Sequence, residues 1–392
     1  MNRRDLLKLI AISEAAYLLN PVLALHAKPK GPNMVSGQQP SGTLDASTRR
    51  EVDAAIDRAL DWLSDEQARD GSWSKADFPA LTALALQAFA LGKHPEKKKT
   101  IKKAKDFILT CVQDDGGIYK NIKGRKGGGL SNYNTAICTT ALFLLQDDEL
   151  LPVIRNARGF IAAGQHQGDD IYKGGFGYDR DTKRAYTDLL NTFYSVETMK
   201  LTESVEDSRP SDEKKADIDW KSTIEYIEKI QNNPDSGPEN EGGFFYKPGE
   251  SKAGETKNKD GEIVFRSYGS MTYVGMLSLI YSDVDKNDPR VMSAFHWSAR
   301  HWSLDENPGM GGEGLYFFYN VLAKCLSAFG RDNIPQSDGS SVDWRKELAV
   351  KLLNEQKVDN KGRGYWVNDT GRFWENDPVL ATSYALIALQ LL

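Results

Sequence analysis

The chain has 392 residues, of which 40% are hydrophobic and 27% are charged, and its formal net charge is −5. This length allows one large domain or two smaller ones, and the apolar fraction is ample for a buried core. The mildly acidic balance and the lack of a basic stripe exclude nucleic acid as an expected partner.

Residues 1–27 have the features of a bacterial export signal. Arg3 and Arg4 precede a moderately apolar stretch that ends at Ala27, as in twin-arginine signals. We therefore expect export, to the periplasm, with an uncleaved anchor or a cytosolic helix as the alternatives. Residues 28–45 are rich in Pro, Gly and Ser and predict a flexible linker. No later segment is long and apolar enough to span a membrane, so the mature sequence gives no indication of membrane association, although it does not exclude it.

A pattern of helix, glutamine and aromatic turn recurs along residues 46–392, which we predict to form a single domain. Its complete copy is RALDWLSDEQARDGSW at residues 58–73. The pattern combines an amphipathic helix, a glutamine at the helix end and a Gly-x-aromatic turn. Six copies can be followed, and in the worn fifth copy a tryptophan replaces the glutamine. These positions are Gln67, Gln113, Gln165, Gln231, Trp302 and Gln356.

Each copy leads into a second helical segment that is apolar on nearly all sides. Such a helix must be surrounded by protein or line an enclosed space, whereas the amphipathic helix can be wet on one face. We therefore predict an all-α fold, an α/α toroid in which six helical hairpins place an inner ring of apolar helices inside an outer amphipathic ring. An open α-solenoid is the alternative, but it would normally have shorter, more regular repeats and polar caps. The predicted inner helices cover residues 79–91, 133–145, 186–199, 268–281, 315–329 and 379–392.

The complete copy resembles the QW motif of squalene–hopene and oxidosqualene cyclases, and related repeats occur in the β subunits of protein prenyltransferases. The resemblance covers essentially all of residues 46–392, with one full match and several partial ones. It implies the α/α toroid. In these families the glutamine and tryptophan tie neighbouring hairpins together, so the match indicates a fold and says little about chemistry.

The catalytic motifs of those families are missing from the sequence. The nearest string to an Asp-x-Asp-Asp acid cluster is Asp283–Lys286, which follows an inner helix and is predicted to be a loop. The five histidines have no Asp-x-Cys partner for a zinc set. Residues 309–314 resemble the loop that forms a thioester in complement-like proteins of the same fold, but Met310 stands where that loop needs cysteine. We therefore expect no metal and no cofactor. The three cysteines are expected to be small buried apolar residues.

The loops that enter the inner helices gather at one mouth of the toroid, where we place the candidate site. Helix N-termini favour an anionic group such as a diphosphate or carboxylate, and ring aromatics favour an apolar lumen that could stabilise a cation. Packing of these aromatic side chains within the fold is the alternative. The predicted ligand-contacting residues of the lumen and rim are Tyr133, Asn134, Asn191, Arg266, Tyr268, Tyr273, Glu313, Tyr316, Trp374 and Asp377.

Asp188 is the predicted general acid, because it is a carboxylate inside an otherwise apolar helix. A buried carboxylate must be paired or shift its pKa upward, and the upward shift is how a general acid is made. The alternative is a satisfied helix cap or an ion pair with Arg184 or Arg266.

Three functional hypotheses follow, and the sequence leaves open whether the protein is an enzyme. The first is a squalene-cyclase- or prenyltransferase-like repeat protein that acts on or binds an isoprenoid or other apolar ligand in the lumen. The second is a non-catalytic exported toroid that binds a lipid, peptide or protein partner. The remote third is a polysaccharide lyase or glycosidase, whose candidate carboxylates are Asp188, Glu313, Glu375 and Asp377.

Overall fold

The computed structural model describes residues 44–92, 97–122, 129–180 and 186–392. The predicted export signal and most of the predicted linker therefore lie outside the described residues. Within the described part, no helix combines the length and apolarity that a membrane span requires.

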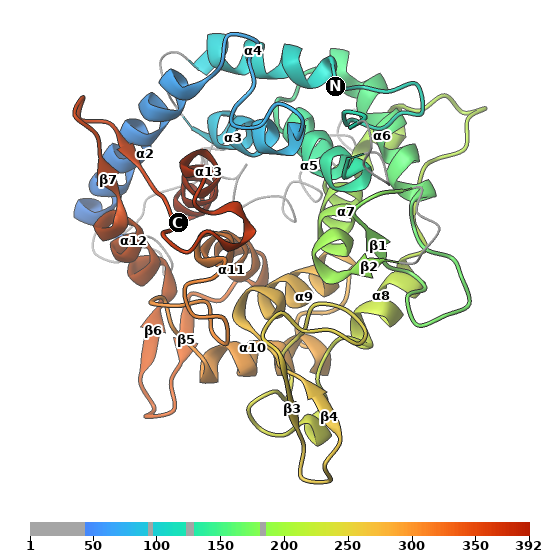
Figure 1. Ribbon diagram of the computed structural model, residues 1–392, viewed down its shortest axis with the longest axis vertical. Helices are drawn as coiled ribbons and strands as arrows, with labels where there is room; N and C mark the ends of the chain where they lie inside the picture. Colours follow the sequence, from blue (N-terminus) through green and yellow to red (C-terminus); the bar gives the residue numbers. More distant parts are fainter. Residues whose placement is uncertain (1–43, 93–96, 123–128, 181–185) are drawn as a thin grey trace, which may run out of the picture.

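The described helices form two concentric rings (Figure 1). Each inner helix packs on the next one along the chain, and α13 packs on α3, so the inner ring closes. The described part of the chain thus confirms the predicted α/α toroid of six hairpins. The outer helices are α2 (Ala46–Glu66), α4 (Lys97–Leu109), α6 (Leu151–Ala163), α8 (Trp220–Glu228), α10 (Pro289–Arg300) and α12 (Trp344–Glu355). The inner helices are α3 (Pro79–Leu91), α5 (Ser131–Leu144), α7 (Leu189–Leu201), α9 (Gly269–Tyr281), α11 (Leu315–Phe329) and α13 (Pro378–Leu389).

The two rings differ in burial as their sequences predict. In α3 every residue from Pro79 to Phe89 is buried, including Thr82 and Gln87. In α2 the buried residues follow a helical stripe while the opposite face is exposed. Cys111, Cys138 and Cys325 are buried, as expected for small apolar residues.

The glutamines of the repeat join neighbouring outer helices. In four copies the side-chain Nε2 donates a hydrogen bond to a backbone carbonyl of the next outer helix or its N-cap. The last of these bonds reaches α2 and closes the outer ring. The four pairs are Gln67–Thr100 (3.1 Å), Gln165–Asp219 (3.0 Å), Gln231–Arg290 (2.8 Å) and Gln356–Ala55 (2.8 Å).

The aromatic turn is fastened within its own hairpin. Trp73 donates through Nε1 to the Leu63 carbonyl of α2 at 2.7 Å and stacks on Phe89 of α3. In five copies the turn also donates a backbone N–H to a threonine hydroxyl near the start of the following inner helix. These pairs are Trp73–Thr82, Ile118–Thr135, Phe176–Thr192, Phe244–Thr272 and Trp366–Thr382, at 2.8–3.1 Å.

Short antiparallel strand pairs and short 3-10 helices lie in the connections. β1 (Phe176–Gly177) pairs with β2 (Thr187–Asp188), with Phe176 opposite Asp188. The pairs β3–β4 and β5–β6 project outward from the ring (Figure 1). The other strands are β3 (Glu255–Lys257), β4 (Ile263–Phe265), β5 (Asn333–Pro335), β6 (Ser341–Asp343), β7 (Lys357–Val358) and β8 (Gly364–Tyr365). The 3-10 turns are η2 (Asp148–Leu150), η3 (Glu203–Ser208), η4 (Pro234–Ser236) and η5 (Arg372–Trp374).

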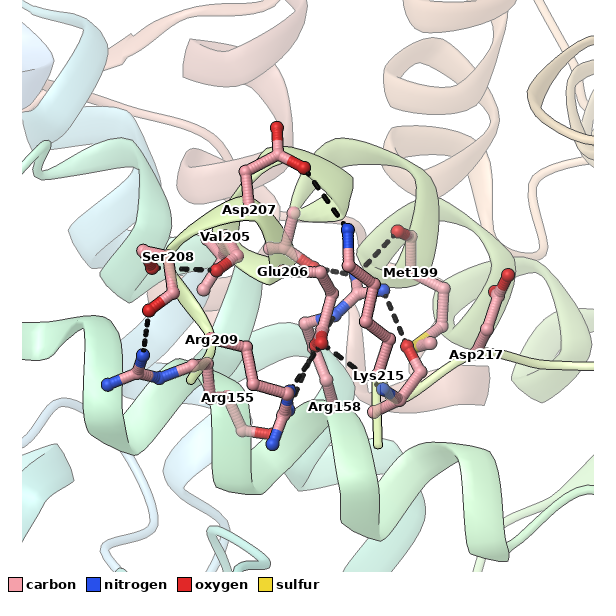
Figure 2. A network of polar contacts seen from close by, with 12 residues as sticks. Arg155, Arg158, Met199, Val205, Glu206, Asp207, Ser208, Arg209, Lys215 and Asp217 are labelled. Carbon is pink, nitrogen blue, oxygen red and sulfur yellow. Dashed lines mark hydrogen bonds and ion pairs between the residues drawn. The ribbon is translucent and has the colours of Figure 1, made fainter. Parts of the chain in front are cut away.

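A buried ion network holds the segment between α7 and α8 against α6 (Figure 2). The Arg158 side chain is 2% exposed, and its Nε lies 2.8 Å from Glu206 Oε1. Arg158 also donates to the Met199 carbonyl and the Thr202 hydroxyl, both at 2.7 Å. Arg209 Nε lies 2.5 Å from Glu206 Oε2. The guanidinium of Arg158 is thus both paired and hydrogen-bonded, which its burial requires.

Candidate lumen site

The mouth of the toroid opens into a cavity of about 490 Å³. Ten of its twenty lining residues are aromatic, and the charged ones are Lys252 and Glu375. The walls come from the first two turns of inner helices and from the loops before them, which is where the sequence predicts the site. Six lining residues are tyrosines, namely Tyr133, Tyr178, Tyr194, Tyr246, Tyr268 and Tyr384.

Three of the tyrosines, on α5, α7 and α13, lie near one another, and each affects the pKa of the others. The rings of Tyr133 and Tyr194 meet edge to face at 5.4 Å. Burial raises the pKa of Tyr133 to about 12. These hydroxyls therefore stay neutral at physiological pH.

Asp188 lies behind this wall as the N-cap of α7. Its side chain is 2% exposed and accepts hydrogen bonds from the Asn191 backbone N–H at 2.9 Å and from Asn191 Nδ2 at 2.8 Å. The Tyr246 side chain lies close enough to act on the pKa of Asp188. Burial raises that pKa to about 6, although the hydrogen bonds from Asn191 and the neighbouring Tyr246 hydroxyl act in the opposite direction. Tyr246 lines the cavity and so connects this carboxyl group with the lumen.

The placement of Asp188 corrects the sequence interpretation in two respects. Asp188 precedes the inner helix instead of lying within it, because Thr187 and Asp188 pair as β2 with β1. The helix cap, which was one alternative for Asp188, is present. Arg266 forms no ion pair with Asp188, because its side chain is exposed and its Nε donates to the Glu255 carbonyl at 3.3 Å. Arg184 lies outside the described residues.

Glu375 is a second buried carboxyl group and reaches the cavity directly. Its oxygens accept hydrogen bonds from the backbone N–H of Phe317 at 2.7 Å and of Tyr316 at 3.1 Å, so it caps α11 from the neighbouring hairpin. Asn368 Nδ2 donates to it at 2.7 Å. Burial raises the pKa of Glu375, against these hydrogen bonds.

The chain's own oxygens occupy the N-terminal ends of the inner helices. At each end a carboxylate or amide oxygen accepts a backbone N–H from the first turn. An anionic ligand would therefore have to compete with a cap already in place. The capping residues, from α3 to α13, are Asn134, Asp179, Asp188, Asn307, Glu375 and Asp377, at 2.7–3.1 Å.

No family model matches the sequence, and no curated protein matches it. The fold, in contrast, matches solved structures over most of the chain. The apo type II terpene cyclase MstE from Scytonema matches with a TM-score of 0.53 and 10% identity, covering 87% of this chain and 98% of that one. A Candida albicans protein geranylgeranyltransferase-I complexed with GGPP matches with a TM-score of 0.51 and 14% identity, covering 88% and 90%.

An enzyme of a different chemistry matches equally well. It is an inactive variant of an α-1,6-mannanase of Salegentibacter sp. HEL1_6 in complex with α-1,6-mannotriose, with a TM-score of 0.53, 10% identity and coverage of 87% and 98%. The chain has the α/α-toroid fold that these enzymes share. At 10–14% identity the similarity extends to the fold and carries no substrate with it.

The toroid brings three of the predicted ligand-contacting residues to the cavity wall, namely Tyr133, Tyr268 and Trp374. Two others, Asn134 and Asn191, act in helix caps, Asn134 for α3 and Asn191 as the partner of Asp188.

The remaining predicted residues contact protein away from the lining. Tyr273 packs on Phe318 and Tyr316 on Tyr319, with 5.8 Å between the ring centroids in each pair. At the rim, Glu313 pairs with Arg372, while Asp377 caps α13 and accepts a hydrogen bond from Ser74. Arg266, as described above, is exposed.

Most of the other lining residues were not predicted, among them Tyr194, Tyr246 and Lys252. A signal for Tyr246 was present, because Gly-Gly-Phe-x-Tyr occurs twice, at 174–178 and 242–246, and both final tyrosines line the cavity. Lys252 lies over the Tyr246 ring at 4.4 Å and pairs with Glu250. No pattern in the sequence marks it.

Among the described residues, no group of three or more His, Cys, Asp or Glu side chains is arranged to hold a metal ion. The titratable groups that line the cavity are the carboxyl group of Glu375, six tyrosine phenols and the Lys252 ammonium group.

Proposed function

We propose that the toroid binds an isoprenoid or similarly apolar ligand in its lumen. The cavity of about 490 Å³ with its aromatic wall is the observation that carries this proposal. Its volume falls in the range of roughly 300–1,000 Å³ that is usual for small-molecule sites, and such sites are mostly apolar with a few polar groups. The structural neighbours support this class, since a MstE variant is complexed with geranylgeranyl dihydroxybenzoate and the transferase with GGPP.

Acid catalysis on that ligand is the second part of the proposal, and the Asp188–Tyr246 pair supports it. The protonated Asp188 would pass its proton to the phenol oxygen of Tyr246 while the phenol proton moves to the ligand. A carboxyl group with a pKa of about 6 is suited to protonating an oxygen atom near neutral pH. It is too weak an acid for an unactivated alkene, so the ligand atom that accepts the proton is expected to be oxygen.

A sugar substrate has less support from the geometry. A glycosidase needs two carboxyl groups on either side of the bond that is cleaved, roughly 5–9.5 Å apart. Of the four carboxylates predicted for that role, Glu375 lines the cavity, whereas Asp188 lies behind the wall as the N-cap of α7. Glu313 pairs with Arg372, and Asp377 caps α13.

The binding proposal is tested by titrating the purified protein with geranylgeraniol and following intrinsic fluorescence or heat. Leu190 lines the cavity from the first turn of α7, so Leu190→Trp should weaken binding by about tenfold or more by filling the lumen. Leu353→Trp on the outer helix α12 is the matched control and should bind as the wild type does. Absence of binding by the wild type, or unchanged binding by Leu190→Trp, would overturn the proposal.

The acid-catalysis proposal is tested with an isoprenoid epoxide and product analysis by mass spectrometry. Asp188→Asn keeps an oxygen for the α7 cap but removes the titrating proton, so it should abolish conversion and leave geranylgeraniol binding intact. Conversion at the wild-type rate by Asp188→Asn, or no conversion by the wild type, would leave binding as the function.

A further inference from the structure

One side of the cavity wall carries a positive charge. Of the described residues that line the cavity, Lys252 alone is cationic, and it lies in the connection between α8 and α9. Tyr246 and Tyr268 belong to the same connection and line the cavity beside it. The anionic lining residue, Glu375, lies before α13, and both of its carboxylate oxygens already accept backbone hydrogen bonds. An ionic contact with a ligand is therefore available from Lys252.

A tight turn holds Lys252 at this position. Lys247 and Glu250 exchange two backbone hydrogen bonds, at 3.1 and 3.0 Å. The Glu250 carboxylate binds two ammonium groups, since Lys247 Nζ lies 2.9 Å from Oε2 and Lys252 Nζ pairs with Oε1. Lys252 Nζ also lies 4.4 Å from the centroid of the Tyr246 ring. The hydrogen bonds from Lys252 and Lys247 lower the pKa of Glu250, so this carboxylate is ionised at neutral pH.

The turn carries more positive charge than its own carboxylate neutralises. Two ammonium groups and one carboxylate leave a net charge of +1. Among the described residues, the hydrogen-bond acceptor of the Lys252 ammonium is Glu250, and an ammonium has three N–H donors. The Lys252 side chain is 28% exposed and lies against aromatic walls, where an ion pair is screened less than in open water. A ligand anion beside Lys252 would complete the charge balance of the turn.

We propose that the ligand of the lumen is an apolar acid, whose carboxylate binds Lys252 while its chain lies in the aromatic cavity. This inference rests on the proposed function, because it names the head group of the ligand proposed there. A carboxylate is a monoanion and matches the net charge of the turn, whereas a diphosphate brings more negative charge than the turn neutralises. The helix N-termini, where the sequence predicts an anion, are already capped by side chains such as Asp188 and Glu375.

The test compares geranylgeraniol with geranylgeranoic acid, which share one chain and differ in the head group. Calorimetric titration of the full protein at pH 7 should show that the wild type binds the acid at least about tenfold more tightly than the alcohol. Lys252→Met keeps a long unbranched side chain and removes the charge, so the ratio of the two affinities should fall by about tenfold. This ratio cancels any general effect of the substitution on the cavity.

Two further variants serve as controls for the charge and its position. Lys252→Arg keeps a cation at the cavity wall and should keep most of the preference for the acid. Lys257→Met removes an exposed lysine from β3, in the same connection, and should keep the wild-type ratio. Circular dichroism and the unfolding midpoint establish that each variant is folded before binding is compared.

The outcomes separate the carboxylate site from the proposed function. If the wild type binds neither ligand, the proposed function fails and the carboxylate site with it. If the wild type binds the alcohol as tightly as the acid, or if Lys252→Met keeps the wild-type ratio, the carboxylate site alone is overturned. Geranylgeranyl diphosphate is the third ligand, and its tighter binding than the acid would overturn the match to a monoanion.

Discussion

At the scale of single residues, two buried carboxyl groups of the toroid are shifted in opposite directions. The pKa of Asp188 is raised to about 6, because burial outweighs the hydrogen bonds that it accepts. For Glu206, burial alone would raise the pKa, but the hydrogen bonds from Arg209 and Arg158 outweigh it and hold the pKa at about 2. The difference lies in the partners, since Asp188 has neutral donors and Glu206 has two guanidinium groups.

Asp188 should make the toroid less stable as the pH rises. Its pKa is about 3.8 in the unfolded chain and about 6 in the fold, so its contribution to stability is complete below pH 3.8 and is lost as the pH rises through 6. A shift of two units corresponds to about 3 kcal/mol. The measurement is the free energy of unfolding of Asp188→Asn and of the wild type in urea at pH 4 and pH 7. From pH 4 to pH 7 the wild type should lose up to this amount relative to the variant. Parallel pH profiles for the two proteins would contradict the raised pKa.

Glu206 should have the opposite pH dependence. Its pKa falls from 4.5 to about 2 on folding, so its contribution is complete above pH 4.5 and is lost as the pH falls through 2. Glu206→Gln leaves the Arg158 guanidinium buried without its charged partner, and we expect a loss of about 3–5 kcal/mol at pH 7 by urea unfolding. The exposed Glu213, which also pairs with Arg209, is the control, because Glu213→Gln should change stability by less than about 1 kcal/mol.

At the scale of elements, the glycines of the repeat set the distance between one hairpin and the next. A Cβ atom on Gly71 would lie 2.1 Å from the Lys103 carbonyl oxygen of α4, and one on Gly174 would lie 2.0 Å from that of Ser222 in α8. Both glycines have a positive φ. In these two copies the turn thus touches the backbone of the following outer helix, which is possible only without a side chain.

Gly174→Ala should separate this close approach from backbone strain. The added Cβ forces the turn away from α8, and together with the left-handed φ of 90° we expect a loss of about 2–4 kcal/mol in the free energy of unfolding. Gly249 has a φ of 79° with nothing within 4 Å of the added Cβ, so Gly249→Ala should lose only about 1 kcal/mol. Equal losses at the two positions would show that strain alone accounts for the glycine.

At the scale of the whole molecule, closure of the ring depends on contacts between residues about 300 apart in the sequence. Gln356 of the last hairpin donates to the Ala55 carbonyl at 2.8 Å and accepts from Arg58 Nη2 at 2.6 Å. The same glutamine position links hairpins adjacent in sequence elsewhere, as in the bond from Gln231 to Arg290. The seam between the last and first hairpins is therefore built as the other junctions are.

Gln356→Ala and Gln231→Ala should then destabilise the toroid by similar amounts, about 1–2 kcal/mol each by urea unfolding. If the ring were open in solution, the bond from Gln356 to Ala55 would not form. Gln356→Ala would then leave the free energy of unfolding unchanged, while Gln231→Ala would still lower it. Comparing the two variants side by side thus measures closure.

The architecture could be predicted from the sequence, because the repeat and the burial of each helix determine which residue types occur at each position. The six copies of the repeat give the number of hairpins, and the contrast between amphipathic and fully apolar helices gives the two rings. The position of the cavity, at the mouth where the inner helices begin, agrees with the same order.

Only the tertiary structure decided which side chains form the lumen. An amphipathic helix shows by its polar stripe which face points outward. The inner helices have no such stripe, so their sequences do not show which face points to the lumen. Tyr133 and Tyr194 therefore reach the cavity while Tyr273, on an equally apolar helix, packs in the core. The raised pKa of Asp188 likewise comes from burial, and Tyr246, 58 positions further along the chain, acts on this pKa only because packing brings the two residues together.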